Sequence, residues 1–297
     1  MVENKELSEE ALVAFVDNED DLRDVLISEA DGLIVLTRQI EIKKNEPLVL
    51  HQGQKLVGQK CLDDELCGLN FVGQHSQSLI NLADDCGFYN LSINVNQGAL
   101  RTNEAFVGEA CRDVVFSDVV IEAELKDNSS LFALRDECSI DFLNGFSLNL
   151  NAKKSFVFCV ENDSRLNFRG SSCLRAEGEN TGILLRFGAT VNLFSGAELA
   201  LCSDTGCVCE DAALNIFGGA SVIFENKVFM KNEFETMQGI FVYKDALFFI
   251  KRRKKLKCCC FKNWRDRVVF SGLRDLGDVF EPLSKTAQRI QETLKDK

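Results

Sequence analysis

The chain has 297 residues, of which 45% are hydrophobic, and a net charge of −12. This is enough apolar material for a large core, and with only two prolines no Pro-rich linker divides the chain. The N-terminus, MVENKELSEE, is acidic and lacks an apolar segment, and no window holds the roughly 18 apolar residues of a membrane span. We therefore expect a soluble cytoplasmic protein, of a host cell or a virion, rather than a secreted or membrane-spanning one.

The first 30 residues carry apolar side chains at helical spacing, in EALVAFV and again in DDLRDVLISEA. Asp20 or Asp21 can cap the second of these segments. Because the β-structure predicted below would expose unpaired strand edges at its end, we interpret residues 1–30 as a helical cap.

A motif recurs every 24 to 27 residues from Ser78 onward, and the segment from Gly182 matches the segment from Gly206 almost position for position. The other copies begin at residues 105, 130, 155 and 239, the last after a longer gap. Each copy alternates apolar and polar residues, as half-buried strands do, and such a period is typical of solenoids. We predict an all-β chain, a right-handed parallel β-helix of about eight to ten coils over residues 31–263, with an insertion near residues 227–238.

Aligned copies place residues of one kind in columns. Apolar residues of the third strands would stack inside the solenoid. Glycines fall at one turn, where a positive φ favours Gly. A polar column runs along the second strands, and we interpret it as a structural amide ladder. The apolar columns are Leu148, Leu174, Leu199 and Val222, and Leu150, Ala176, Leu201 and Phe224; the glycines are Gly145, Gly170, Gly196 and Gly219; the polar column is Asp141, Asn167, Asn192 and Asn215, ending at Phe249.

The thirteen cysteines are odd in number and irregularly spaced. Without a signal peptide, this favours reduced thiols over a disulfide framework. Cys159, Cys173, Cys207 and Cys209 fall at positions expected to be inside, where a thiol packs as a small hydrophobic group. Neither the CVC pair nor the CLDDELC stretch has the ligand spacing of a zinc site, so we expect no metal there.

After the first helical segments, the chain reads DGLIVL, IEI, EPLVL and KLVGQ between residues 31 and 59. This succession resembles the opening coils of pectin-lyase-like right-handed β-helix proteins, and the similarity covers about residues 20–260. The resemblance implies a fold that serves polysaccharide lyases, glycoside hydrolases, tailspikes and non-catalytic virion or effector scaffolds.

Catalysis of that kind needs converging carboxylates, or a basic residue beside carboxylate-bound Ca²⁺. An acidic column does lie at the first turn of successive coils: Asp84, Asp85, Asp113, Asp136, Asp163 and Asp211, with Asp245 in the last. We interpret it as a hydrated rim; the alternatives are Ca²⁺ binding or a catalytic set made of Asp85, Arg112 and Asp113. The two histidines, His51 and His75, are expected at polar turn positions.

Residues 251–267, KRRKKLKCCCFKNWRDR, carry nine Lys or Arg and one Asp, so that the other 280 residues carry −20. The run Lys251–Lys255 is expected to replace the glycine turn of the last coil. A protein partner is the first interpretation, with anionic membrane or nucleic acid as alternatives, and pairing with the chain's own acidic faces remains open. The contact residues would be Lys251, Arg252, Arg253, Lys254, Lys255, Lys257 and Trp264, and the possible acylation sites Cys258, Cys259 and Cys260.

Residues 264–297 read as a connector and an amphipathic helix that begins near Pro282. This helix would cap the last coil or join a second copy in an oligomer. The function we expect is a non-enzymatic structural or interaction scaffold that uses its basic, aromatic C-terminal end. The alternatives are a carbohydrate-active enzyme and a peripheral membrane protein anchored by the basic, Cys-rich segment.

Overall fold

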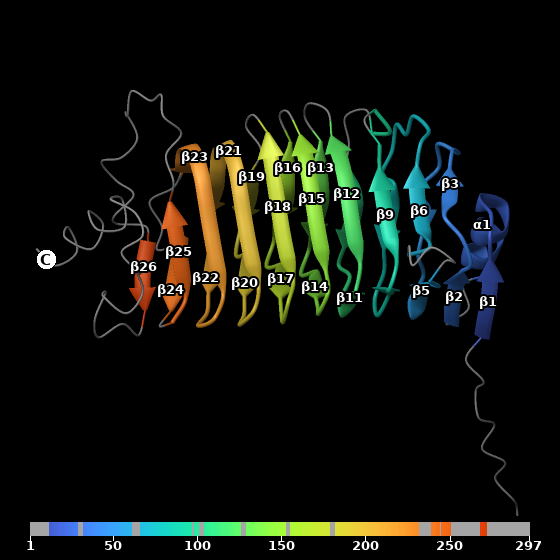
Figure 1. Cartoon of the computed structure of the whole chain (residues 1–297), viewed down its shortest axis with the longest axis horizontal. Helices are drawn as coiled ribbons and strands as arrows, with labels where there is room; N and C mark the ends of the chain where they lie inside the picture. Colours follow the sequence, from blue (N-terminus) through green and yellow to red (C-terminus); the bar gives the residue numbers. More distant parts are fainter. Residues whose placement is uncertain are drawn as a thin grey trace, which may run out of the picture.

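A computed structural model shows a parallel β-solenoid of about seven turns (Figure 1). It describes residues 12–28, 32–60, 66–96, 98–100, 104–125, 129–152, 155–178, 182–231, 239–243, 245–250 and 268–271. All pairings between its named strands are parallel, because each strand lies beside the corresponding strand of the next coil. The predicted all-β parallel solenoid is confirmed, with fewer turns than the eight to ten that we expected.

The second strand of each coil belongs to an 11-stranded sheet, which we call the second face. Its strands are β1 (Leu12–Val16), β2 (Gly32–Leu36), β5 (Gln54–Gly58), β8 (Gly87–Tyr89), β11 (Val114–Ser117), β14 (Ser139–Phe142), β17 (Arg165–Phe168), β20 (Thr190–Leu193), β22 (Ala213–Ile216), β24 (Gly239–Tyr243) and β26 (Val268–Ser271).

The first and third strands belong to one 15-stranded sheet. The first face comprises β4 (Leu48–Val49), β7 (Ile80–Leu82), β10 (Glu104–Glu109), β13 (Ser130–Arg135), β16 (Phe156–Val160) and β19 (Gly182–Arg186). The third face comprises β3 (Ile40–Ile42), β6 (Gly68–Phe71), β9 (Ser92–Val95), β12 (Val120–Leu125), β15 (Ser147–Ala152), β18 (Cys173–Gly178), β21 (Glu198–Glu210), β23 (Ser221–Lys231) and β25 (Leu247–Ile250). The two faces join because β21 pairs with β18 along its first half and with β19 along its second.

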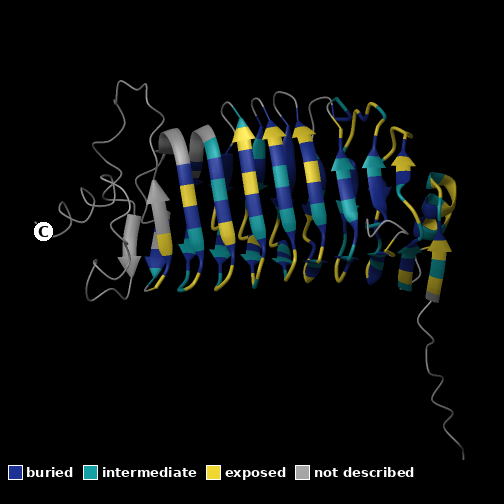
Figure 2. Ribbon diagram, in the orientation of Figure 1, coloured by how far each residue is buried: buried dark blue, intermediate teal, exposed yellow. Residues whose placement is uncertain are grey.

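The strands form where apolar and polar residues alternate, and the apolar ones point inward (Figure 2). Leu148 lies beside Leu174, Leu174 beside Leu199, and Leu199 beside Val222, as the aligned copies predicted. All four are buried. Because a coil cannot cover its own inner surface, this stacking supplies the core.

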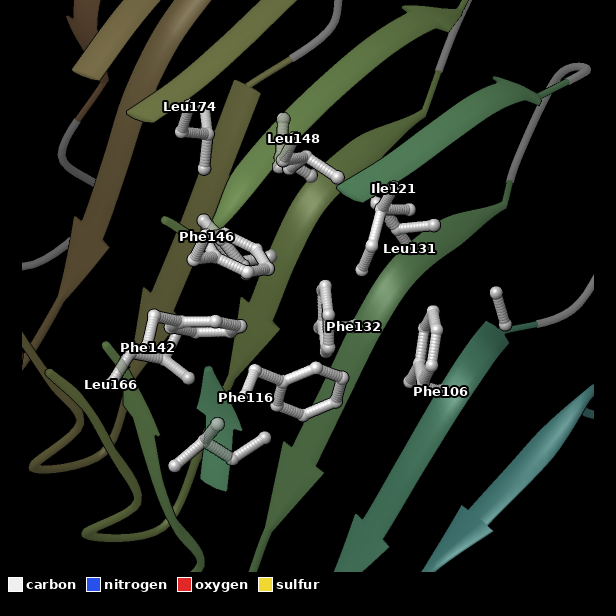
Figure 3. Packing of buried hydrophobic residues seen from close by; sticks show 14 of the residues in the cluster. Phe106, Phe116, Ile121, Leu131, Phe132, Phe142, Phe146, Leu148, Leu166 and Leu174 are labelled. Atoms are coloured by element: carbon white, nitrogen blue, oxygen red, sulfur yellow. The ribbon is translucent and has the colours of Figure 1, made fainter. Parts of the chain in front are cut away.

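Two columns of phenylalanine fill the middle of the solenoid (Figure 3). On the second face, the ring centroids of Phe116 and Phe142 are 5.3 Å apart and those of Phe142 and Phe168 4.6 Å apart. On the first face, the rings of Phe106 and Phe132 stack at 4.6 Å. The columns meet edge to face, which is a favourable aromatic geometry, so the rings lock neighbouring coils in register.

The turns between the second and third faces use the predicted glycines, all with positive φ. A Cβ at Gly145, where φ is 73°, would come within 2.2 Å of the Asp118 carboxylate of the preceding coil. Both the backbone angle and the neighbouring coil therefore require glycine here.

The amide ladder on the outside of the second face is also confirmed. The Asn192 side chain donates to the Asn167 amide oxygen at 2.9 Å, and Asn215 donates to Asn192 at 2.8 Å. Its end was mispredicted, because Phe241 rather than Phe249 pairs with Asn215.

The cause is the register of the last coil, which differs from the one that we predicted. The segment Val228–Lys231, expected in an insertion, continues β23 and pairs with the second half of β21. The strand that begins at Gly239 therefore belongs to the second face. The glycine-turn position of this coil is Asp245, whose carbonyl accepts from the Gly219 N–H at 2.8 Å, so the turn is not at Lys251–Lys255.

The N-terminal cap differs from the prediction. Leu12–Val16 form strand β1 and pair with β2, so this segment is not helical. Helix α1 (Glu19–Ile27) is present, with Asn18 as its N-cap and Leu22 and Leu26 buried in the core. Residues 1–11 lie outside the described part of the chain.

At the other end, Val268–Ser271, expected in a connector, form β26 and extend the second face beyond residue 263. The predicted C-terminal helix near Pro282 lies outside the described residues. Its proposed roles as a cap or an oligomer contact stay predictions.

Most described cysteines are reduced, as expected. Cys207 and Cys209 are buried, whereas Cys159 and Cys173 occupy half-buried outward positions rather than the interior. Cys67 is an exception to the expectation of reduced thiols, because it is disulfide-bonded.

Candidate functional site

The basic segment that we expected to contact a partner, from Lys251 to Trp264, lies outside the described residues. This includes the possible acylation sites Cys258, Cys259 and Cys260. The preceding strand β25 ends on the third face at Ile250. The partner and membrane contacts of this segment stay predictions.

The acidic column at the first turn has a conformational origin. Its aspartates adopt the left-handed region, which Asp and Asn tolerate better than most residues other than glycine, with φ between 51° and 59° at Asp85, Asp113, Asp136, Asp163 and Asp211. Asp245 belongs to the glycine-turn column instead, so its assignment to this column was wrong. The turn shape alone is sufficient reason for aspartate at these places.

The catalytic candidates Asp85, Arg112 and Asp113 lie on this exposed rim. The Asp85 N–H donates to the Arg112 carbonyl at 2.8 Å, so the backbone brings neighbouring coils together. The side chains diverge, since the Arg112 guanidinium pairs with Glu137 and the Asp85 carboxylate lies 3.6 Å from Lys55 Nζ. The Asp113 N–H donates to Ser139. The Asp85 and Arg112 side chains therefore have different partners, and a catalytic role for Asp85, Arg112 and Asp113 stays a prediction.

A groove lies on the outer side of the third face, over β9, β12, β15 and β18. Its volume is about 490 Å³. Strand pairing places its polar lining residues in two parallel columns. The first column is Asn94, Glu122, Asn149 and Arg175. The second is Glu124, Asn151 and Glu177, with Asn96 at its end. In Figure 2 these strands show exposed and half-buried bands between buried ones.

The lining groups are held by contacts between coils. Asn149 donates to a Glu122 carboxylate oxygen at 2.7 Å, and Asn96 donates to Asn70 at 2.8 Å. With Glu122, Glu124, Glu177 and Arg175, the groove has three carboxylates and one guanidinium. It can therefore offer both donors and acceptors, but its net charge disfavours a polyanion.

A ladder of alternating charges, which the sequence interpretation missed, runs along the outer edge of the first face. Register places Glu109 beside Arg135 and Arg186 beside Glu210, and Glu161 pairs with both arginines. Arg186 Nε lies 2.6 Å from Glu210, whose side chain is only 5% exposed. The signal was present as acids and arginines separated by 24 to 26 residues, one coil each.

No protein-family model, curated protein or solved structure matches this chain. Membership of the pectin-lyase-like superfamily therefore stays a resemblance. What the structure supports is the parallel β-solenoid itself.

Two further expectations concern metal and histidine. Within the described ranges, no group of three or more His, Cys, Asp or Glu side chains is arranged to hold a metal ion, and Ca²⁺ binding stays a prediction. His75 is fully buried rather than at a polar turn, and its ring meets Phe71 edge-on at 5.8 Å. Burial lowers the pKa of His75 below 6.5 because the charged form loses its hydration. His51 is half-buried.

None of the described helices is long and apolar enough to cross a membrane.

Proposed function

We propose that this protein is a non-enzymatic binding scaffold and that the groove on the third face holds a neutral glycan chain. The observation that carries the proposal is the groove lining: amides, carboxylates and one guanidinium in columns that repeat from coil to coil. The groove volume of about 490 Å³ falls within the range of ligand sites.

The ligand class follows from the hydrogen-bonding groups. Each sugar hydroxyl both donates and accepts, and Asn94, Asn96, Asn149 and Asn151 can do the same through their amides. A basic peptide needs chiefly acceptors, so it would leave the amide and guanidinium donors without a matching role. Adjacent coils are about 4.8 Å apart, so the columns present similar groups repeatedly along the solenoid axis, as a polymer of similar units requires.

Glycoside hydrolysis is the second candidate, and Glu122 and Glu124 favour it. They are two residues apart on the outer face of β12, so their Cα atoms are about 6.7 Å apart and their side chains leave the strand on the same side. Inverting hydrolases keep their carboxyl groups, rather than their Cα atoms, about 6.5–9.5 Å apart, and two parallel side chains can meet that spacing. Binding without hydrolysis is the better-supported function, because both carboxylates lie on one strand instead of flanking a bond from two sides.

The test is titration of the full chain with a panel of neutral oligosaccharides, followed by assay for newly formed reducing ends. We expect binding without cleavage, weakened at least about tenfold by Arg175→Ala or Asn149→Ala. The matched control is Arg165→Ala, an exposed arginine on the second face.

Each outcome has a distinct meaning. Cleavage that depends on Glu122 and Glu124 would replace the scaffold with the hydrolase. Binding of a basic peptide in preference to every oligosaccharide, or equal loss of binding in the Arg175 and Arg165 variants, would refute the glycan groove.

We further propose, independently of the groove, that the basic segment 251–267 contacts a protein partner. Its support is the charge of +8 beside a body of −20. Co-sedimentation with anionic liposomes and with nucleic acid, using the full chain and a variant with Lys251–Lys255 neutralised, separates the alternatives. If the full chain binds liposomes or nucleic acid in a salt-sensitive way and the variant does not, that ligand replaces a protein as the proposed partner of the segment.

A further inference from the structure

Two buried cysteines from neighbouring coils meet at the first turn. The Sγ atoms of Cys111 and Cys138 are 3.2 Å apart, and 2% and 0% of the two residues is exposed. The Cys111 N–H also donates to Cys138 Sγ at 3.1 Å. The Cys138 sulfur therefore accepts two hydrogen bonds from Cys111, one from its backbone and one from its thiol, and its own thiol donates to the Arg135 carbonyl at 2.9 Å.

A glycine makes room for the two sulfurs. A Cβ at Gly108 on β10 would lie 2.6 Å from Cys111 Sγ and 3.3 Å from Cys138 Sγ. Any larger residue would push at least the nearer sulfur away. The close approach of the thiols thus depends on three residues of two adjacent coils.

The hydrogen bond from the Cys111 thiol lowers the pKa of Cys138 to about 7, because it stabilises the thiolate. The same contact raises the pKa of Cys111, the donor. Cys86, in the preceding coil, differs, since burial raises its pKa to about 12. A thiolate is the form that reacts with peroxides, so the pair has one nucleophile and one proton donor.

We propose that Cys111 and Cys138 are a redox modification site, where hydrogen peroxide converts the two thiols into a disulfide between coils. The Cys138 thiolate attacks one peroxide oxygen, the O–O bond breaks, and the departing hydroxide takes a proton to become water. The Cys111 sulfur then attacks the resulting sulfenic acid, an S–S bond forms, and its thiol proton leaves with the hydroxide as a second water. Two thiols are oxidised and one peroxide is reduced to two waters.

The consequence is a covalent link across a turn that is otherwise held by hydrogen bonds and packing. The disulfide would close a loop over residues 112–137 and restrict the unfolded chain. We expect the oxidised protein to unfold at a higher urea concentration than the reduced one.

Peptide mass spectrometry tests the proposal on the full wild-type chain. Trypsin places Cys111 in residues 102–112 and Cys138 in residues 136–153. After brief exposure to hydrogen peroxide and blocking of remaining thiols, we expect these peptides joined, with the loss of two hydrogen atoms. Addition of a reductant should separate them. Because a reductant also cleaves the disulfide of Cys67, the urea midpoint is compared between peroxide-treated and untreated protein, both without reductant.

Two variants complete the test. Cys138→Ser should abolish the cross-link and the midpoint shift, whereas Cys86→Ser, a buried cysteine one coil away, should keep both. If Cys138→Ser fails to fold, the wild-type peptide map still decides. Sulfinic acid at Cys138 without a cross-link, or a peptide map in which neither cysteine reacts unless the protein is denatured, would overturn the proposal.

Discussion

Arg186 is the cation on which the C-terminal half of the charge ladder depends. Its guanidinium pairs with Glu210 at 2.6 Å and with Glu161 at 3.4 Å. The Glu210 side chain is 5% exposed and that of Glu161 20%. Replacing Arg186 by Met keeps the aliphatic length but leaves both carboxylates without this partner.

The expected cost follows from burial. Removing one partner of a fully buried ion pair costs about 3–5 kcal/mol, because the remaining charge is desolvated and unpaired. The Arg186 side chain is 35% exposed, so water already screens part of the attraction. We expect Arg186→Met to lower the free energy of unfolding by about 2–3 kcal/mol.

The assay is urea unfolding followed by far-UV circular dichroism, with Arg169→Met as the matched control. Arg169 pairs with Asp141 at 3.3 Å, but their side chains are 48% and 37% exposed. Its guanidinium also lies 4.3 Å from the Phe194 ring centroid. Together these surface contacts are worth about 1 kcal/mol.

A double-mutant cycle identifies the cause. If the unpaired Glu210 carboxylate causes the loss, Glu210→Gln in the Arg186→Met background should restore at least about 1 kcal/mol. The reasoning is refuted if Arg186→Met costs no more than Arg169→Met, or if the cycle shows no coupling between Arg186 and Glu210.

Three further predictions concern the core and the outer face. Burial lowers the pKa of His75, so the unfolded chain binds protons more readily and stability should fall as pH drops below about 6.5. His75→Leu should therefore reduce the change in urea midpoint between about pH 7.5 and about pH 5.5, and an unchanged pH dependence would contradict this. Asn192→Ala removes the ladder bonds with Asn167 and Asn215 and should lower the free energy of unfolding in urea by about 1–2 kcal/mol. An unchanged free energy of unfolding would mean that these two bonds contribute nothing to stability. Phe142→Ala should cost about 3–5 kcal/mol by the same measurement, against less than about 1 kcal/mol for the exposed Phe187→Ala, and similar losses would argue against the ring column.

The sequence predicted the parts of the fold that repeat within each coil. The alternation of apolar and polar residues predicted the strands, the repeat length predicted the coils, and Gly145, Gly170 and Asn192 predicted the columns. These features depend only on local backbone preferences and a constant spacing. The prediction was wrong where the spacing changed. Val228–Lys231 was taken for an insertion because its strand continues directly from the third face without a turn residue.

The candidate site was less predictable. The sequence suggested that aspartates of the first turn could be catalytic, yet their positive φ angles are sufficient to explain why aspartate occupies these positions. The groove went unnoticed because Glu122, Asn149 and Arg175 occupy outward positions that, in one coil alone, look like ordinary surface. Only their stacking across coils places them together.

The sequence by itself therefore determined the architecture: parallel coils with apolar residues inside and glycine or aspartate at the turns. The tertiary structure decided which charges pair, which polar side chains share the groove and which thiols meet. The physical reason is register. Residues such as Cys111 and Cys138, or Arg186 and Glu210, are a full coil apart in sequence, and turns of unequal length determine whether they become neighbours.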